Sequence, residues 1–117
     1  MSHRAACTLM LWIAMVGSPA RAQDAPDPVA GRTLALKVCD TCHIVAPDQQ
    51  MAPFLKQPAP SFAAIANRPS TSAQSLRTFL AGVHANLGTT AVGMPNPRLT
   101  DQQTENVIAY LLSLRRP

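Results

Sequence analysis

The 117-residue chain has few aromatic residues, with three phenylalanines, one tyrosine and one tryptophan. So few large rings cannot build a sizeable core, and domains of this size often need a disulfide, a metal or a cofactor for stability. Cysteine is scarce as well: there are three, and Cys39 and Cys42 stand too close together to close a large loop. We therefore expect something other than a long-range disulfide to stabilise the fold.

The chain also lacks a hydrophobic run long enough to cross a membrane. Its longest uncharged, largely apolar stretch, Ala5 to Val16, is too short to span a bilayer core of ~30 Å as a helix. This stretch follows Arg4 and precedes the small-x-small sequence Ala20-Arg21-Ala22, which is the order of a secretory signal peptide. We expect residues 1–22 to be a cleaved signal peptide, not a permanent anchor, and residues 23–117 to form one domain.

Runs of basic residues are missing too. Removal of the signal peptide takes away two arginines and no acid, so the formal net charge falls from +4 to +2. The remaining basic residues are scattered apart from Arg115 and Arg116, and no aromatic residues are interleaved with them. This pattern gives no support for nucleic-acid binding. The expected product is a periplasmic protein with no membrane span after cleavage.

Hydrophobic periodicity predicts an all-α domain with three main helices, short turns and irregular connections, because no segment alternates with the period of a strand. The first helix is expected to begin at Pro28, with Asp27 as its N-cap, and to run through the apolar positions between Val29 and Val38 into Cys39. Gly31 inside this helix costs ~1 kcal/mol relative to alanine. A glycine there indicates that something packs close against the backbone.

The other two main helices carry N-terminal signals of their own. Thr71, with Gln74 three residues later, predicts a capping box at the start of the second helix. The last helix is expected to begin in the same way at Thr100. Four prolines exclude regular structure from residues 46–60, and a short helical turn is expected over residues 60–68.

The segment LKVCDTCHIV places His43 directly after the pair Cys39 and Cys42. A thioredoxin-like dithiol is expected at the end of a strand in an α/β fold, but here the pair follows a helix. A structural zinc site needs four ligands, and the chain offers no matching second pair. Cys-x-x-Cys-His is instead the attachment signature of a c-type haem. Each thiol can form a thioether with a haem vinyl group, and the imidazole can then coordinate the iron.

With this motif the chain resembles a small class I cytochrome c over nearly all of residues 23–117. Gly31 stands eight residues before Cys39, where that family has the glycine of its N-terminal helix. Tyr110, in VIAYLLSL, supplies the aromatic residue that the family places beside the crossing of its N- and C-terminal helices. The resemblance implies the cytochrome c fold, with three main helices and short turns wrapped around one covalent haem.

The stretch PSFAAIANR, residues 60–68, is similar to the family's segment after the haem attachment site. On this match the carbonyl of Pro60 would accept a hydrogen bond from the imidazole of His43. Two side chains would line the haem and a third would approach a propionate, in the order Phe62, Ile65 and Arg68. The chain departs from the family at Ala35, where a larger packing residue is usual, and it has no tryptophan near the propionates.

The sixth ligand of the iron has three candidates in the mature chain: Met94, His84 and Met51. Met51 lies eight residues after His43 in the proline-rich segment, and His84 stands at the end of an amphipathic helix, where a polar residue is ordinary. Met94 is 51 residues beyond His43, which gives the chain ample length to reach the far side of the haem. The resemblance also places the family's methionine ligand there. We expect His43 and Met94 to hold the iron, with the other two as alternatives.

A thioether ligand favours ferrous iron and raises the reduction potential. With both axial positions filled, little room remains for oxygen or peroxide. We therefore expect a periplasmic one-electron carrier that is not an enzyme and that meets redox partner proteins in small, transient contacts. The alternatives are the haem subunit of a periplasmic dehydrogenase and a haem-based ligand-binding or peroxidase-type protein.

Overall fold

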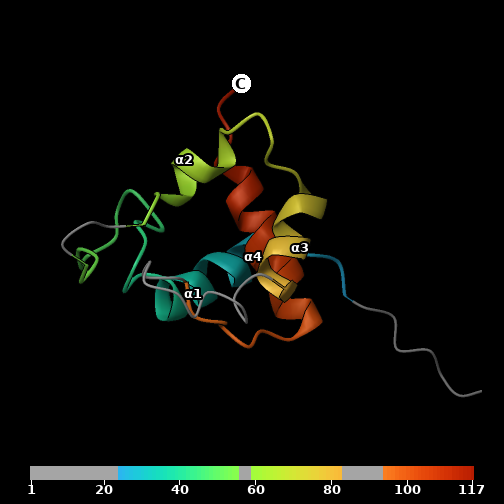
Figure 1. The fold of residues 1–117 in the computed structure, drawn as a ribbon, viewed down its shortest axis with the longest axis horizontal. Coiled ribbons are helices and arrows are strands. Elements are labelled where there is room, and N and C mark those ends of the chain that lie inside the picture. The colour runs from blue at the N-terminus through green and yellow to red at the C-terminus, as the bar shows by residue number, and fades with distance from the viewer. Residues whose placement is uncertain (1–23, 56–58, 83–93) are drawn as a thin grey trace, which may run out of the picture.

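The computed structural model describes residues 24–55, 59–82 and 94–117, and in these residues it is helical without any strand. The helices are α1 (Pro28–Val38), α2 (Phe62–Ala66), α3 (Ala73–Gly82) and α4 (Asp101–Ser113). α1, α2 and α3 all pack against α4, which lies at the centre of the domain (Figure 1). The predicted all-α class, with three main helices and one short one, is confirmed.

Two predictions concern segments outside these helices. The predicted signal peptide, residues 1–22, lies outside the described residues and stays a prediction. The described part of the proline-rich segment, residues 46–55 and 59–60, contains no helix or strand, as its prolines require. Within the three described ranges, no helix is both long enough and apolar enough to traverse a bilayer.

The N-terminal cap of α1 forms as its sequence predicts. The Asp27 carboxylate accepts hydrogen bonds from the backbone N–H groups of Val29 and Ala30, at 2.8 and 3.2 Å. The N–H of Asp27 in turn donates to the side-chain oxygen of Asn106 on α4, at 2.9 Å. The cap therefore both begins α1 and ties that beginning to α4.

The crossing of α1 and α4 is closest at Gly31, which lies against the backbone of Asn106. A Cβ atom built on Gly31 would lie 1.9 Å from the carbonyl oxygen of Asn106 and 2.4 Å from its carbonyl carbon. No side chain fits in this space, which explains why a residue unfavourable to helices stands inside α1. Ala35, one turn further along α1, and Tyr110 of α4 are both buried in the core.

The start of α3 differs from the prediction by one residue. The capping residues are Ser72 and Ser75: the N–H of Ser75 donates to Oγ of Ser72 at 3.0 Å, and the N–H of Ser72 donates to Oγ of Ser75 at 2.9 Å. The predicted capping box of Thr71 with Gln74 is therefore wrong. Thr71 is buried, and its hydroxyl donates to the carbonyl of Ile65 at 2.6 Å, so it is not available to the helix.

The capping box predicted at the start of α4 is present. The N–H of Gln103 donates to Oγ1 of Thr100, and the N–H of Thr100 donates to Oε1 of Gln103. This cap fixes where α4 begins. The face of α4 that packs against the other helices supplies four buried core residues: Val107, Ile108, Tyr110 and Leu111.

Replacement of Gly31 with alanine tests the α1–α4 crossing. The added methyl group overlaps the Asn106 carbonyl, and overpacking of this kind costs about 1–3 kcal/mol. That cost opposes and is expected to exceed the gain of ~1 kcal/mol in helix propensity. Chemical denaturation of the purified protein should therefore show a lower midpoint. Lys37→Ala, at an exposed position of α1, should change the free energy of unfolding by no more than about 0.5 kcal/mol. A Gly31→Ala protein as stable as the parent would show that the backbones do not approach so closely.

Candidate cofactor site

A largely apolar cavity of about 560 Å³ lies between the segment after α1, helices α2 to α4 and the segment before α4. Its volume falls within the range of roughly 300–1,000 Å³ typical of small-molecule sites. Eight of the residues that line it are the predicted site residues: Cys39, Cys42, His43, Pro60, Phe62, Ile65, Arg68 and Met94. They come from separate parts of the sequence, and folding brings them to one cavity.

The two cysteines reach the cavity because the attachment motif forms a tight turn at the end of α1. Cys39 is the C-cap of α1, and its N–H donates to the carbonyl of Ala35 at 2.8 Å. Its own carbonyl accepts hydrogen bonds from the N–H groups of Cys42 and His43, at 3.2 and 2.9 Å. The turn thereby places two thiols and one imidazole on the same cavity wall.

The Cys39 thiol lacks the activation that a reactive dithiol needs. Burial raises its pKa to about 11, with smaller contributions from Asp40 and Cys42, whereas reactive thiols have a lowered pKa. No group of three or more His, Cys, Asp or Glu side chains in the described ranges could hold a metal ion. The redox and zinc alternatives therefore gain no support from the geometry.

The imidazole of His43 is buried, and its two nitrogens differ. Nδ1 lies 2.7 Å from the carbonyl oxygen of Pro60. Because a carbonyl only accepts, Nδ1 carries the proton and Nε2 offers a lone pair. Nε2 is fully buried and has no hydrogen-bond partner in the part of the chain that the structure describes. Buried polar atoms without partners are rare, and a lone pair fixed in this way is the form in which histidine binds metals.

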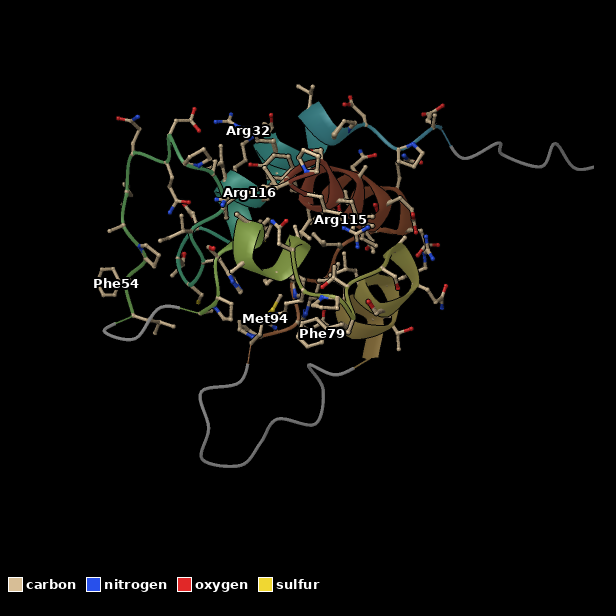
Figure 2. The ribbon with its side chains drawn as sticks, turned by 90° about the horizontal axis from the view of Figure 1, so that it is seen from above. Arg32, Phe54, Phe79, Met94, Arg115 and Arg116 are labelled. Carbon is tan, nitrogen blue, oxygen red and sulfur yellow. The ribbon has the colours of Figure 1, made fainter. Side chains whose placement is uncertain are left out.

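The candidates for the second axial ligand differ in position. Met94 is half-buried and lines the same cavity as Phe79 of α3; both side chains are labelled in Figure 2. Met51 is 71 % exposed and does not line the cavity. His84 lies outside the described residues. The geometry therefore favours Met94 over Met51, and its bond to iron stays a prediction.

Polar groups line one part of the cavity, where α2 turns into α3. Arg68 is the only charged residue among the described lining residues. Ser70, Thr71 and Ser75 line the cavity nearby, but the hydroxyls of Thr71 and Ser75 already donate to backbone carbonyls. This part of the wall suits the negatively charged end of an otherwise apolar ligand.

One residue that supports the site carried no signal in the sequence. Gln49 accepts a hydrogen bond from the N–H of Val45 at 2.8 Å and donates to the carbonyls of Met51 and His43, at 2.7 and 3.3 Å. The hydroxyl of Tyr110 also donates to the carbonyl of Val45, at 3.0 Å. These bonds fix the backbone that follows His43. Gln49 stands in an irregular segment without periodicity or a motif, so its role appears only in the folded chain.

Comparison with known proteins gives two matches that agree with this geometry. A family model described as "Cytochrome c" matches residues 28–115. A protein named "Cytochrome c-552" from Bradyrhizobium diazoefficiens is 34% identical over 113 residues, which cover 97% of this chain and 96% of that protein. No solved structure matches the chain.

The role of the two thiols can be tested by removing both. We expect Cys39→Ala combined with Cys42→Ala to lose all covalently bound haem after expression in a host that attaches haem c. Each single variant should keep at most one thioether bond. Intact mass and haem staining under denaturing conditions measure this, so the result does not depend on whether the variant folds. Haem still bonded to the double variant would contradict the assignment of both cysteines.

Proposed function

Because this chain belongs to the cytochrome c family, we propose that it is a periplasmic one-electron carrier with one haem c, bonded through Cys39 and Cys42 and held between His43 and Met94. Bound haem c supplies an iron that exchanges one electron between its ferrous and ferric states. The chain supplies the attachment thiols, the axial side chains and an apolar shell. Export to the periplasm is proposed from the signal-peptide pattern of residues 1–22.

The observation that carries this proposal is the unpartnered Nε2 of His43. The residue is only 6 % exposed, and this nitrogen has no hydrogen-bond partner among the described residues. A polar atom left in this state costs about 1–3 kcal/mol. Coordination of iron would remove that cost, because the lone pair of Nε2 would then have a partner. The motif places the imidazole directly beside both attachment thiols, where the iron of a bonded haem would lie.

The surroundings of His43 would hold the imidazole in place as a ligand and would influence the reduction potential of the iron. The hydrogen bond from Nδ1 to the carbonyl of Pro60 fixes the tautomer and the ring orientation and raises the basicity of the ligand nitrogen. Phe62 packs edge-on against the imidazole, with ring centroids 5.6 Å apart. An apolar shell limits the access of water, which is one of the factors that set a reduction potential.

The proposed pair of axial side chains favours electron transfer over catalysis. With both His43 and Met94 on the iron, no coordination position would stay open for a substrate or a gas. A ligand-binding or peroxidase-type function would require Met94 to be absent from the iron or easily displaced. Its half-buried position on the cavity wall, followed by Pro95, supports a fixed ligand.

Exposed apolar side chains beside the attachment motif support transient contact with redox proteins. Ile44, Met51 and Phe54 are 46, 71 and 90 % exposed, and Phe54 points away from the helices (Figure 2). The N–H of Phe54 donates to the carbonyl of Thr41, within the motif, at 2.8 Å. Small, partly apolar patches suit short-lived electron-transfer contacts. Reproducible co-purification with a large dehydrogenase would instead show a fixed subunit.

Alanine variants of the two methionines test the axial assignment. We expect haem-loaded Met94→Ala to lose the weak red absorption band that methionine sulfur gives ferric haem. Its ferrous form should bind carbon monoxide, and its potential should fall by part of the roughly 0.8 V over which axial ligands set haem potentials. Met51→Ala and His84→Ala are the matched controls and should change none of these. Loss of the band in either control, with the band retained in Met94→Ala, would overturn the assignment.

A further inference from the structure

Residues beyond the end of α4 bond directly to the turn that joins α2 to α3. Nε of Arg115 donates to the carbonyl of Ala66 at 3.1 Å, and Nη2 of Arg115 donates to the carbonyl of Thr71. These two carbonyls lie on either side of Arg68 and Ser70 in the sequence. One guanidinium thus spans both ends of the turn that lines the polar part of the cavity.

A second pair of hydrogen bonds joins the same two segments. Nδ2 of Asn67 donates to the carbonyl of Leu114 at 3.3 Å, and Oδ1 of Asn67 accepts from the N–H of Arg116 at 3.0 Å. Figure 1 shows the C-terminal segment leaving α4 beside α2. Arg116 takes part through its backbone alone, because its guanidinium has no hydrogen bond or ion pair within the described ranges.

The turn has hydrogen bonds of its own, but these are local in the sequence. The N–H of Arg68 and the hydroxyl of Thr71 both donate to the carbonyl of Ile65, at 3.2 and 2.6 Å, and the hydroxyl of Ser75 donates to the carbonyl of Ser70. The bonds from Arg115 and Asn67 are the ones that tie the turn to the end of α4. The Arg68 side chain is exposed and has no side-chain partner in the described part of the chain. Where its guanidinium lies thus depends on how firmly the backbone of residues 66–71 is held.

We propose that Arg115 is a positioning residue, which braces residues 66–71 so that Arg68 stays at the propionate end of the haem. The proposal rests on the proposed function, because it requires haem in this cavity. Arg115 does not line the cavity and acts through Arg68. A guanidinium close to a carboxylate lowers the pKa of that carboxylate, so a firmly held Arg68 keeps the propionates ionised to lower pH.

The other charged groups of the neighbouring elements do not replace Arg68. Arg77 of α3 pairs with Glu105 of α4 at 2.5 Å, and both residues line a separate pocket. Arg98, in the segment before α4, and Asp101, in the first turn of α4, line that same separate pocket, and α2 has no charged residue. Among the described residues, Arg68 on the wall and Arg115 behind it are therefore the cations that this turn brings together.

The pH dependence of the reduction potential tests the brace in haem-loaded protein. Ionisation of a propionate favours ferric iron, so the potential falls as pH rises through the propionate pKa. We expect Arg115→Gln to move this inflection upward by up to about one pH unit, because Arg68 holds the carboxylate less firmly. Arg116→Gln removes the same charge from the adjacent residue and should leave the inflection in place.

Two further variants distinguish the effect of the hydrogen bonds to residues 66–71 from the effect of the charge of Arg115. Arg115→Lys keeps the charge but replaces the planar guanidinium, which bonds to two carbonyls, with a single ammonium. We therefore expect a smaller upward shift of the inflection than in Arg115→Gln. Asn67→Ala removes the other pair of bonds without any change of charge and should also shift the inflection upward. Faster hydrogen exchange at the amides of Arg68 and Thr71 should accompany each shift.

The outcomes distinguish the brace from the proposed function. Equal shifts in Arg115→Gln and Arg116→Gln would show a charge effect and overturn the brace. An Arg115→Gln profile that coincides with the parent would overturn it as well. If Arg115→Gln fails to fold, Arg115→Lys and Asn67→Ala decide, and parental profiles in both would refute the brace. A parent chain that carries no haem would instead refute the proposed function.

Discussion

The close approach of α1 and α4 at Gly31 is the constraint from which the position of the site follows. Gly31 lies against the Asn106 carbonyl, and the bond from Asp27 to the Asn106 side chain fixes the same end of α1. Because Cys39 caps the other end of α1, the crossing determines where both thiols and His43 lie relative to α4. A small shift of α1 would move the whole attachment motif along the wall formed by Val107, Ile108 and Leu111.

The segment after His43 has no repeating hydrogen-bond pattern, so individual side chains hold it in place. The bonds from Tyr110 and Gln49 to the Val45 backbone are shielded from solvent wholly or in part, and their loss would leave unsatisfied groups in the interior. The ion pair of Arg32 with Asp48 is 2.7 Å long but exposed, so solvent screens it and it contributes less. The interior bonds therefore matter most for keeping the imidazole aimed at the cavity.

The parts of the fold that the sequence predicted are those with local signals. The caps at Asp27 and Thr100 depend on residues two or three positions apart, and the close contact at Gly31 follows from a glycine in a helix. The cap of α3 was predicted one residue early because Thr71 bonds to Ile65, a tertiary contact that no spacing rule contains.

The same reasoning explains why two supporting residues could not be foreseen. Arg115 reaches carbonyls more than forty positions away, and Gln49 acts inside a proline-rich loop without periodicity. The residues predicted from the attachment motif and its resemblance do share one cavity, but a cavity wall alone does not show a bond to iron. Which side chains support the residues of the cavity wall, as Gln49 and Arg115 do, is determined by long-range packing.

The cavity also accounts for the shortage of aromatic residues. Side chains alone leave a largely apolar wall around about 560 Å³ in a domain of this size. Apolar surface left against water costs roughly 25 cal/mol per Å². A large apolar group in this cavity would therefore complete the core.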